Sequence, residues 1–263
     1  MAVKYKHPDV YDCICFVPFL SEYQVNLILM RLKLNQTISF SRFALFLCCL
    51  ISPNLTAQSQ ISKINTVFLI VMSDQSWSDI KSNASAPYIN SLLATASSAD
   101  NYFSPNGSGY SLGNYLWLEA GTNFGVTVNP NSLQTNTGSH FVRLLENAGL
   151  TWKCYEEGIA GNSCPVSSTA DYDTKYNPFI YFDDIKNNQA SCVKHIRPYN
   201  EFATDLNNNT IANYNFIRPG KCNSMFRFCT NVGDHVKQGD NWLSQEVPKI
   251  MASSAYKNGG QYL

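Results

Sequence analysis

Apolar and polar residues follow one another along this chain in blocks whose periods predict strands separated by helices. Residues 65–72 read Asn-Thr-Val-Phe-Leu-Ile-Val-Met, a largely continuous apolar run rich in β-branched and aromatic side chains. Such a run is typical of a central strand that is buried on both faces of a parallel sheet. Residues 150–155 and 213–217 are predicted as two further strands.

Helical spacing fills the intervals between these strands. Ser85 is the predicted N-cap of a first helix with Pro87 in its first turn, and Ile89, Leu92, Leu93 and Ala96 form its apolar face. A second helix is predicted from about Ser111 to Gly121. A third is predicted from the cap Ser139 to Gly149, with core positions Phe141, Leu144, Leu145 and Ala148. Alternating strands and helices predict a three-layer α/β/α sandwich with a mainly parallel sheet.

The first sixty residues have a different pattern. An apolar run at 43–51 is too short to cross a bilayer, and basic residues precede it while small and polar residues follow it. This order is that of a secretory signal peptide. Because Met30 begins a basic segment, we interpret 1–29 as an upstream extension and 30–57 as a signal peptide cleaved after Ala57. The folded domain is then 58–263. The alternatives are a single N-terminal membrane anchor and an apolar element of the fold.

The cysteines agree with a secreted, extracellular protein. Removal of the leader leaves five: Cys154, Cys164, Cys192, Cys222 and Cys229. None of their spacings is that of a zinc site, so two disulfides and one odd thiol are expected in an oxidising compartment. Cys222–Cys229 is the first pair to propose and Cys164–Cys192 the second. Glycosylation sequons at Asn83, Asn106 and Asn208 add weak support for secretion.

Composition and charge exclude several classes of protein. The 263 residues carry 19 Lys and Arg against 19 Asp and Glu, a formal net charge of zero, with no basic stripe to neutralise phosphates. A strongly basic nucleic-acid-binding protein is therefore excluded. Hydrophobic residues make up 44% and aromatic residues 13%, which provides a core and excludes general disorder.

Two segments are placed for chemistry, because ligands of open α/β sheets bind beyond the carboxyl ends of the strands. Asp74 follows the first predicted strand and is suited to a cation, although capping a turn is an alternative role. Ser111 lies at a loop-to-helix junction, where free backbone N–H groups favour an anion. A serine there can attack phosphorus when a metal lowers its pKa, and Asn114 can donate to a phosphoryl oxygen. The alternative is that Ser111 only caps the helix.

Five stretches in a fixed order carry a family resemblance. They are residues 67–72 with Ser76-Trp77, 85–93, 111–116 with Ala120-Gly121, 176–182, and 239–243 with Val247-Pro248. In these stretches the chain from 67 to 263 resembles the phosphoesterase family of secreted acid phosphatases and phospholipases C, within the alkaline-phosphatase-like superfamily. The resemblance implies an alkaline-phosphatase-like fold and hydrolysis of a small phosphate ester or phospholipid head group with a divalent metal ion. Contact with a membrane is expected only if the leader stays uncleaved.

Site residues follow from matching motifs. The family's Pro-Ser-Leu-Pro-Asn-Tyr motif falls on 110–115, so the resemblance implies Ser111 as nucleophile and Asn114 as phosphate ligand. Met-Glu-Asn-His-Ser-Trp falls on 72–77, which puts Ser73 at the Glu position and Asp74 at the Asn position. Asp240 is kept in a Gly-Asp-x-Trp-Leu motif. The resemblance therefore implies Asp74 and Asp240 as metal ligands.

The chain also departs from the family pattern. A Lys-His-Asn-Pro segment appears as 175–178 without its His, and Cys-Asn-Asp-Met-His-Asp appears as 222–227 without its two acids and its His. His140, His195 and His235 lie off the motifs, and we expect surface or hydrogen-bonding roles for them.

In the family, the strand after Gly-Gly continues into a Trp-Asp-Glu motif and later a His. Here the sequence ends at 260–263, so the domain is expected to be incomplete at its C-terminus. Two interpretations remain open. The first is an active metal-assisted phosphoesterase, and the second is a non-catalytic or fragmentary relative that keeps the fold. A structural or adhesive secreted protein is a third interpretation.

Overall fold

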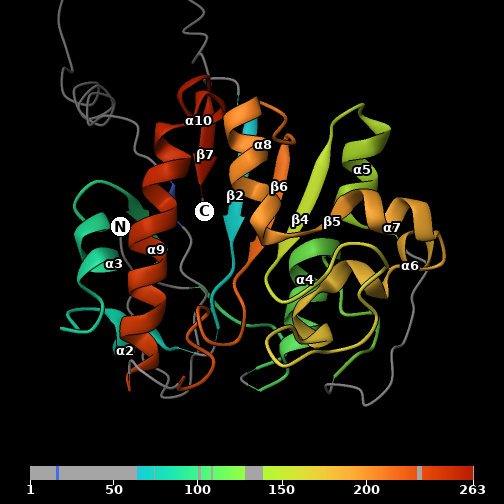
Figure 1. The fold of residues 1–263 in the computed structure, drawn as a ribbon. Helices are drawn as coiled ribbons and strands as arrows, with labels where there is room; N and C mark the ends of the chain where they lie inside the picture. Colours follow the sequence, from blue (N-terminus) through green and yellow to red (C-terminus); the bar gives the residue numbers. More distant parts are fainter. Residues whose placement is uncertain are drawn as a thin grey trace, which may run out of the picture. The chain divides into compact units, whose positions relative to one another are not determined.

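Five strands that pair only in parallel form the central sheet among the residues that the structure describes (Figure 1). The structure is a computed structural model that describes residues 16–17, 64–73, 75–99, 102–107, 109–127, 139–229 and 233–262. The strand order is β5 (Ile196–Pro198), β4 (Trp152–Glu156), β6 (Tyr214–Arg218), β2 (Thr66–Ile70) and β7 (Gly260–Tyr262). Two short strands, β1 (Phe16–Val17) and β3 (Ser97–Ser98), pair antiparallel beside it.

Alternation along the strands divides the core into two clusters, one on each face of the sheet. Successive side chains of a strand point to opposite faces. Phe68 and Ile70 of β2 belong to one cluster, whereas Leu69 of the same strand belongs to the other. Tyr155 and Cys154 of β4 divide in the same way. Both of these strands are therefore buried from both sides, and for β2 the long apolar run at 65–72 predicts this.

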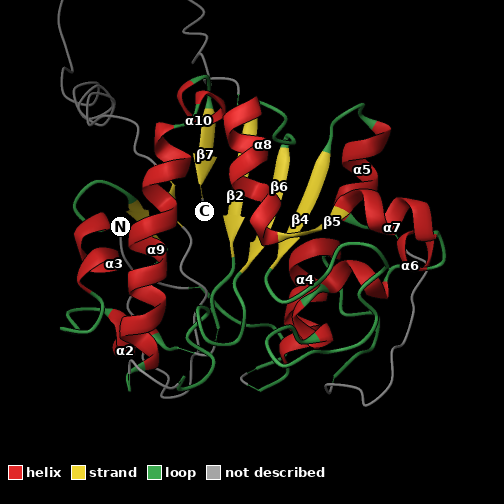
Figure 2. Cartoon of the chain, in the orientation of Figure 1, coloured by secondary structure: helices red, strands yellow, loops and turns green. Residues whose placement is uncertain are grey.

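Helices cover both faces (Figure 2). Those that contribute to the Phe68 cluster are α2 (Trp77–Ile80), α3 (Pro87–Leu92), η3 (Tyr199–Glu201), α8 (Phe202–Asn208), α9 (His235–Ala252) and α10 (Ser254–Lys257). Those that contribute to the Leu69 cluster are α4 (Ser111–Ala120), α5 (Phe141–Asn147), η1 (Thr174–Tyr176), η2 (Pro178–Tyr181), α6 (Asp183–Lys186) and α7 (Gln189–His195). The predicted α/β/α sandwich with a parallel sheet is confirmed.

Local predictions at the helix ends are partly wrong. Helix α3 has Ala86 as its N-cap, while the Ser85 hydroxyl donates to Asp234. Helix α5 is capped by His140 and not by Ser139, since His140 Nδ1 accepts from the Arg143 N–H at 3.3 Å. The end of α4 is confirmed, because Gly121 adopts a left-handed φ of 65° directly after the helix.

The predicted core face of α5 also needs correction. Phe141 and Leu144 are 41% and 55% exposed, whereas Val142 is buried and Leu145 packs against the Leu69 cluster. Either set of residues satisfies helical spacing, and the contact with the sheet selects the second set. The sequence pattern within so short a helix does not distinguish the two faces.

Both predicted disulfides are present. Cys164 is bonded to Cys192, which ties the segment after β4 to helix α7, and Cys222 is bonded to Cys229 in the connection between β6 and α9. Cys154 is a buried free thiol in the middle of β4. The five mature cysteines therefore divide into two bonds and one odd thiol, as expected.

A buried carboxyl group couples the stability of this core to pH. Glu119 of α4 is buried and accepts a hydrogen bond from the Tyr214 hydroxyl of β6. Burial raises the pKa of Glu119 from 4.5 to about 7, while the Tyr214 hydrogen bond opposes this rise. The folded state therefore holds a proton at pH values where the unfolded chain has released it.

We predict that the free energy of unfolding falls as pH rises from about 5 to about 7. Stabilisation by the Glu119 proton is complete below 4.5 and is lost as pH rises through about 7, because the unfolded state ionises first. Urea denaturation at several pH values measures this slope. Glu119→Gln should make the slope shallower, and Tyr214→Phe should extend it to higher pH, because loss of the hydrogen bond to the carboxylate raises the pKa of Glu119 further. A wild-type slope in Glu119→Gln would contradict the prediction.

Candidate functional site

The carboxyl ends of the central strands lie at one edge of the sheet, because all the strands run in the same direction. Ser73 follows β2, Glu156 and Glu157 end and follow β4, and Arg218 ends β6. Arg218 is only 2% exposed. Its Nη1 donates to the Val71 carbonyl at 3.0 Å, and its Nη2 donates to the Ser73 hydroxyl. A guanidinium group therefore joins the ends of β2 and β6.

The surroundings of this guanidinium leave its charge without a direct carboxylate partner. No salt bridge to Arg218 is present among the described residues, and its Nε has no hydrogen-bond partner there. The guanidinium stacks over the Tyr176 ring at 4.4 Å. Burial raises the pKa of nearby Glu156 to about 8, although the Arg218 charge opposes this rise. At neutral pH Glu156 is therefore mostly protonated.

Glu157 holds the frame of the site. Its carboxylate accepts hydrogen bonds from the Gly220 N–H at 2.7 Å, from Asn223 Nδ2 at 2.9 Å and from Trp242 Nε1 at 3.0 Å. These donors come from the β6–α9 connection and from α9. One carboxylate thus ties the end of β4 to the segment that carries Arg218 and to a covering helix.

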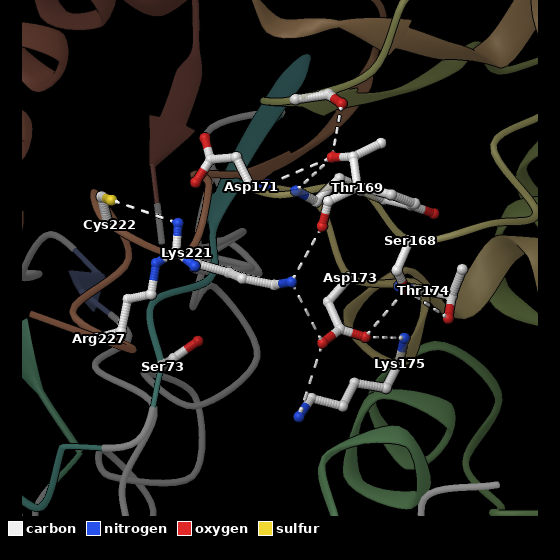
Figure 3. A network of polar contacts seen from close by, with 12 residues as sticks. Ser73, Ser168, Thr169, Asp171, Asp173, Thr174, Lys175, Lys221, Cys222 and Arg227 are labelled. Carbon is white, nitrogen blue, oxygen red and sulfur yellow. Dashed lines mark hydrogen bonds and ion pairs between the residues drawn. The ribbon is translucent and has the colours of Figure 1, made fainter. Parts of the chain in front are cut away.

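Two lysines converge on one aspartate next to this frame (Figure 3). The ammonium groups of Lys175 and Lys221 each lie 3.8 Å from Asp173 Oδ2. Lys221 also donates to the Thr169 carbonyl at 3.2 Å. Lys175 lies over the Tyr176 ring at 4.9 Å. The edge therefore carries several cations around one aromatic ring.

A small pocket, with space for about one water molecule, opens in this region. Its lining includes Arg218, Lys221, Tyr176 and Asp171. A Cβ at Gly220 would lie 2.0 Å from Asp171 Oδ2, so a larger residue at this position would displace the Asp171 side chain. Asp171 Oδ1, like Arg218 Nε, is buried without a hydrogen-bond partner among the described residues. Within the described part of the chain, the residues that line the pocket therefore include an unpaired donor, Arg218 Nε, and an unpaired acceptor, Asp171 Oδ1.

Ser111 is the first residue of α4, with Tyr110 in the capping position, so the simple N-cap alternative is wrong for this serine. Its hydroxyl makes no hydrogen bond to another described residue and is partly exposed. Tyr115 lies four residues later on the same helix face, and its ring packs 5.8 Å from the Tyr176 ring. The face of α4 that carries Ser111 is thus turned toward the Tyr176 and Arg218 neighbourhood.

Asn114 has a bracing role in this structure. Its Oδ1 accepts from the Asn106 N–H at 2.9 Å, and its Nδ2 donates to the Gly107 carbonyl at 3.0 Å. Both ends of the amide therefore hold the loop that precedes α4. One N–H of Nδ2 is used on Gly107, so the predicted contact with phosphate would use the second N–H of the amide.

Asp240 is likewise engaged. It is 1% exposed in α9, and its Oδ1 and Oδ2 accept from the Ile89 and Tyr88 N–H groups at 2.8 and 3.0 Å. The carboxylate thus caps the N-terminus of α3 and joins it to α9. Burial raises the pKa of Asp240, and these two hydrogen bonds oppose the rise.

The metal site that the sequence predicts stays a prediction, since only one of its two ligands is described. Asp74 lies outside the described residues, and the lone pairs of Asp240 are directed at backbone N–H groups. In the described ranges, no three His, Cys, Asp or Glu side chains gather as metal ligands. Among them the carboxyl edge instead offers a guanidinium and a hydroxyl, so we derive no chemical step through a metal.

Two of the three histidines have the hydrogen-bonding roles that the sequence analysis expects. His140 Nε2 contacts Asp184 Oδ1 at 3.0 Å, and His195 Nδ1 donates to the Trp152 carbonyl at 2.9 Å. Sequence reasoning missed Arg218, although the rule that singled out Asp74 applies to it as well. Arg218 directly follows the apolar residues of 213–217, and a polar residue at a strand end was the available signal.

Comparison with known proteins identifies relatives of this chain. The model of the phosphoesterase family matches residues 64–259. A phosphatidylinositol-3-phosphatase of Mycobacterium tuberculosis is 27% identical over 202 residues, which cover 77% of this chain and 61% of that protein. A probable acid phosphatase of Kluyveromyces lactis is 30% identical over 117 residues, 42% of this chain and 28% of that protein. An acid phosphatase of Aspergillus niger is 28% identical over 111 residues, 40% and 26% respectively. The matched region thus spans less than two thirds of each relative.

The capping role of Asp240 gives a test by stability. Asp240→Ala should lower the free energy of unfolding by about 2 kcal/mol, because it leaves two N–H groups of α3 unpaired in a buried place. Asp240→Asn keeps one acceptor oxygen and should lose about half as much. Urea denaturation measures both changes.

The same pair of variants separates capping from metal binding. Calorimetric titration with a divalent cation should give the same affinity for the wild type and for Asp240→Asn. A large loss of cation affinity in Asp240→Asn, with stability near that of the wild type, would restore Asp240 as a metal ligand.

Proposed function

Because this chain belongs to the phosphoesterase family, we propose that it cleaves phosphate ester bonds with Ser111 as the nucleophile. The observation that carries the proposal is the position of Ser111. Ser111 is partly exposed and is the first residue of a ten-residue helix. It lies on the same face of that helix as Tyr115, which packs against Tyr176 at the carboxyl edge of the sheet. The positive end of the dipole at such a helix terminus favours an anion and a deprotonated serine.

The proposed reaction has two steps. Ser111 Oγ attacks phosphorus and loses its proton, the bond from phosphorus to the ester oxygen breaks, and the leaving alcohol takes up a proton. Water then attacks the phosphoseryl group, which releases inorganic phosphate and restores the hydroxyl. The predicted divalent ion stays a prediction, because Asp74 lies outside the described residues and Asp240 is engaged.

The substrate class is proposed from the relatives. Their names, acid phosphatase and phosphatidylinositol-3-phosphatase, support a small phosphate ester or a phosphorylated lipid head group. Two disulfides support the proposed secretion of the mature chain. In the described ranges, no helix has the length and apolar character needed to cross a membrane.

A second candidate is a relative that keeps the fold without turnover. The observation that favours it is the engagement of Asn114 and Asp240, two of the four predicted site residues, in holding a loop and a helix. In that case the chain binds phosphate esters without cleaving them. The two candidates differ in whether a phosphoryl group is transferred to Ser111.

Ser111→Ala should reduce hydrolysis of p-nitrophenyl phosphate to background, because no attacking oxygen remains. Its cost in folding stability should stay below about 1 kcal/mol, since the serine is not the cap residue. Ser91→Ala, which removes an exposed helical serine of α3, is the matched control and should keep full activity. Acid quenching during turnover, followed by mass spectrometry, should place a phosphoryl group on the Ser111 peptide.

Two outcomes would decide against the proposal. Retention of most activity by Ser111→Ala would show that another group attacks phosphorus. Binding of phosphate esters without any turnover by the wild type would favour the second candidate.

A further inference from the structure

A buried positive charge without a counter-charge marks the carboxyl edge. Transferring a guanidinium group out of water is costly unless it is paired and hydrogen-bonded. Arg218 is 2% exposed, uses two of its nitrogens on Val71 and Ser73, and leaves Nε without a partner among the described residues. Its remaining N–H donors can therefore pair with an anion while the two hydrogen bonds to Val71 and Ser73 are kept.

Three of the four acids that line this pocket are occupied or neutral. Glu157 accepts three N–H donors, and Asp173 faces Lys175 and Lys221. Glu156 is mostly protonated at neutral pH because burial raises its pKa to about 8. Asp171, the remaining acid of the pocket, packs against Gly220. None of these carboxylates forms an ion pair with Arg218.

A second cation is available at the same pocket. Lys221 lines it together with Arg218, and its ammonium group lies 3.8 Å from Asp173, longer than a charge-assisted hydrogen bond. Asp173 has Lys175 as another partner at the same distance (Figure 3). Exchange of the Lys221–Asp173 pair for a contact with an anion therefore loses little. The pocket now has space for about one water molecule, and rotation of the long Lys221 side chain would widen it.

The residues at this edge differ in charge from the family pattern. Ser73, at the position where the family has a metal-facing Glu, accepts a hydrogen bond from Arg218. Ser224, Phe226 and Arg227 take the positions of two acids and a His. A protein guanidinium thus contacts the position from which the family's carboxylate would contact a metal.

We propose that Arg218, supported by Ser73 and Lys221, binds the phosphate group of the ligand at this edge, and that this binding requires no divalent metal. The choice of a phosphate group rests on the function proposed above. A guanidinium group suits a phosphate because its donors can pair with two oxygens at once. The Ser73 hydroxyl accepts from Arg218 and can donate its own proton to a third oxygen.

The test is calorimetric titration of the full chain with inorganic phosphate, with and without EDTA. We expect the same dissociation constant in both conditions. Arg218→Gln should weaken binding at least about tenfold, and Arg218→Lys by less, because the charge is kept but the paired donors are lost. Arg143→Gln is the matched control, since Arg143 is an exposed arginine of α5 that pairs with Asp184.

Lys221→Gln keeps the test valid if Arg218→Gln does not fold. Lys221 is partly exposed, so its variant should fold and bind phosphate a few-fold more weakly. Loss of phosphate binding in EDTA, absence of binding by the wild type, or wild-type affinity in both Arg218→Lys and Lys221→Gln would overturn the inference.

Ser111→Ala separates this inference from the proposed function. It should lose turnover and keep the phosphate affinity of the wild type. Phosphate binding without turnover in the wild type would overturn the proposed function alone, whereas turnover with no effect of Arg218→Lys or Lys221→Gln on phosphate affinity would overturn the inference alone.

Discussion

Parallel pairing of β2 with β6 is the constraint on which the candidate site depends. The register of Ile70 opposite Ile217 places the residues that follow each strand at the same edge. Arg218 therefore meets Val71 and Ser73, although about 145 residues separate them in the sequence. An antiparallel pairing would have put these strand ends at opposite edges. The direction of the strands thus determines which polar groups can act together.

The partners of a polar side chain, and not its place in a motif, decide what it does here. Asp240 and Asn114 both stand at motif positions, yet both hold backbone groups of neighbouring segments. A helix end leaves N–H groups unpaired, and a buried carboxylate satisfies them well. Each oxygen that accepts an N–H has fewer lone pairs left for a metal ion. Structural and chemical demands compete for the same lone pairs.

Local charge at the edge cannot be read from net charge. The chain is neutral overall, yet burial keeps Glu156 largely protonated and leaves the Arg218 charge uncompensated beside it. Lys175 and Lys221 share a single aspartate, Asp173, close to the same pocket. Desolvation thus makes the edge more positive than its residue composition suggests, because it penalises the charged form of the carboxyl group.

The sequence by itself determined the α/β class and the central strand, because these depend on the local period of apolar residues. It also determined the glycine that ends α4, through turn geometry, and the disulfide pairs, because five cysteines leave few alternative pairings. The face of α5, the cap of α3 and the role of Asp240 were decided by tertiary contacts. The first depends on apolar packing against the sheet, and the other two on which distant group lies within about 3 Å, a distance that hydrogen bonds require. The role of Arg218 was also decided by tertiary contacts, because it depends on the hydrogen bond to Ser73, which follows a different strand. The order of residues along the chain does not give the distances between such distant groups, because these are set only when the strands pair.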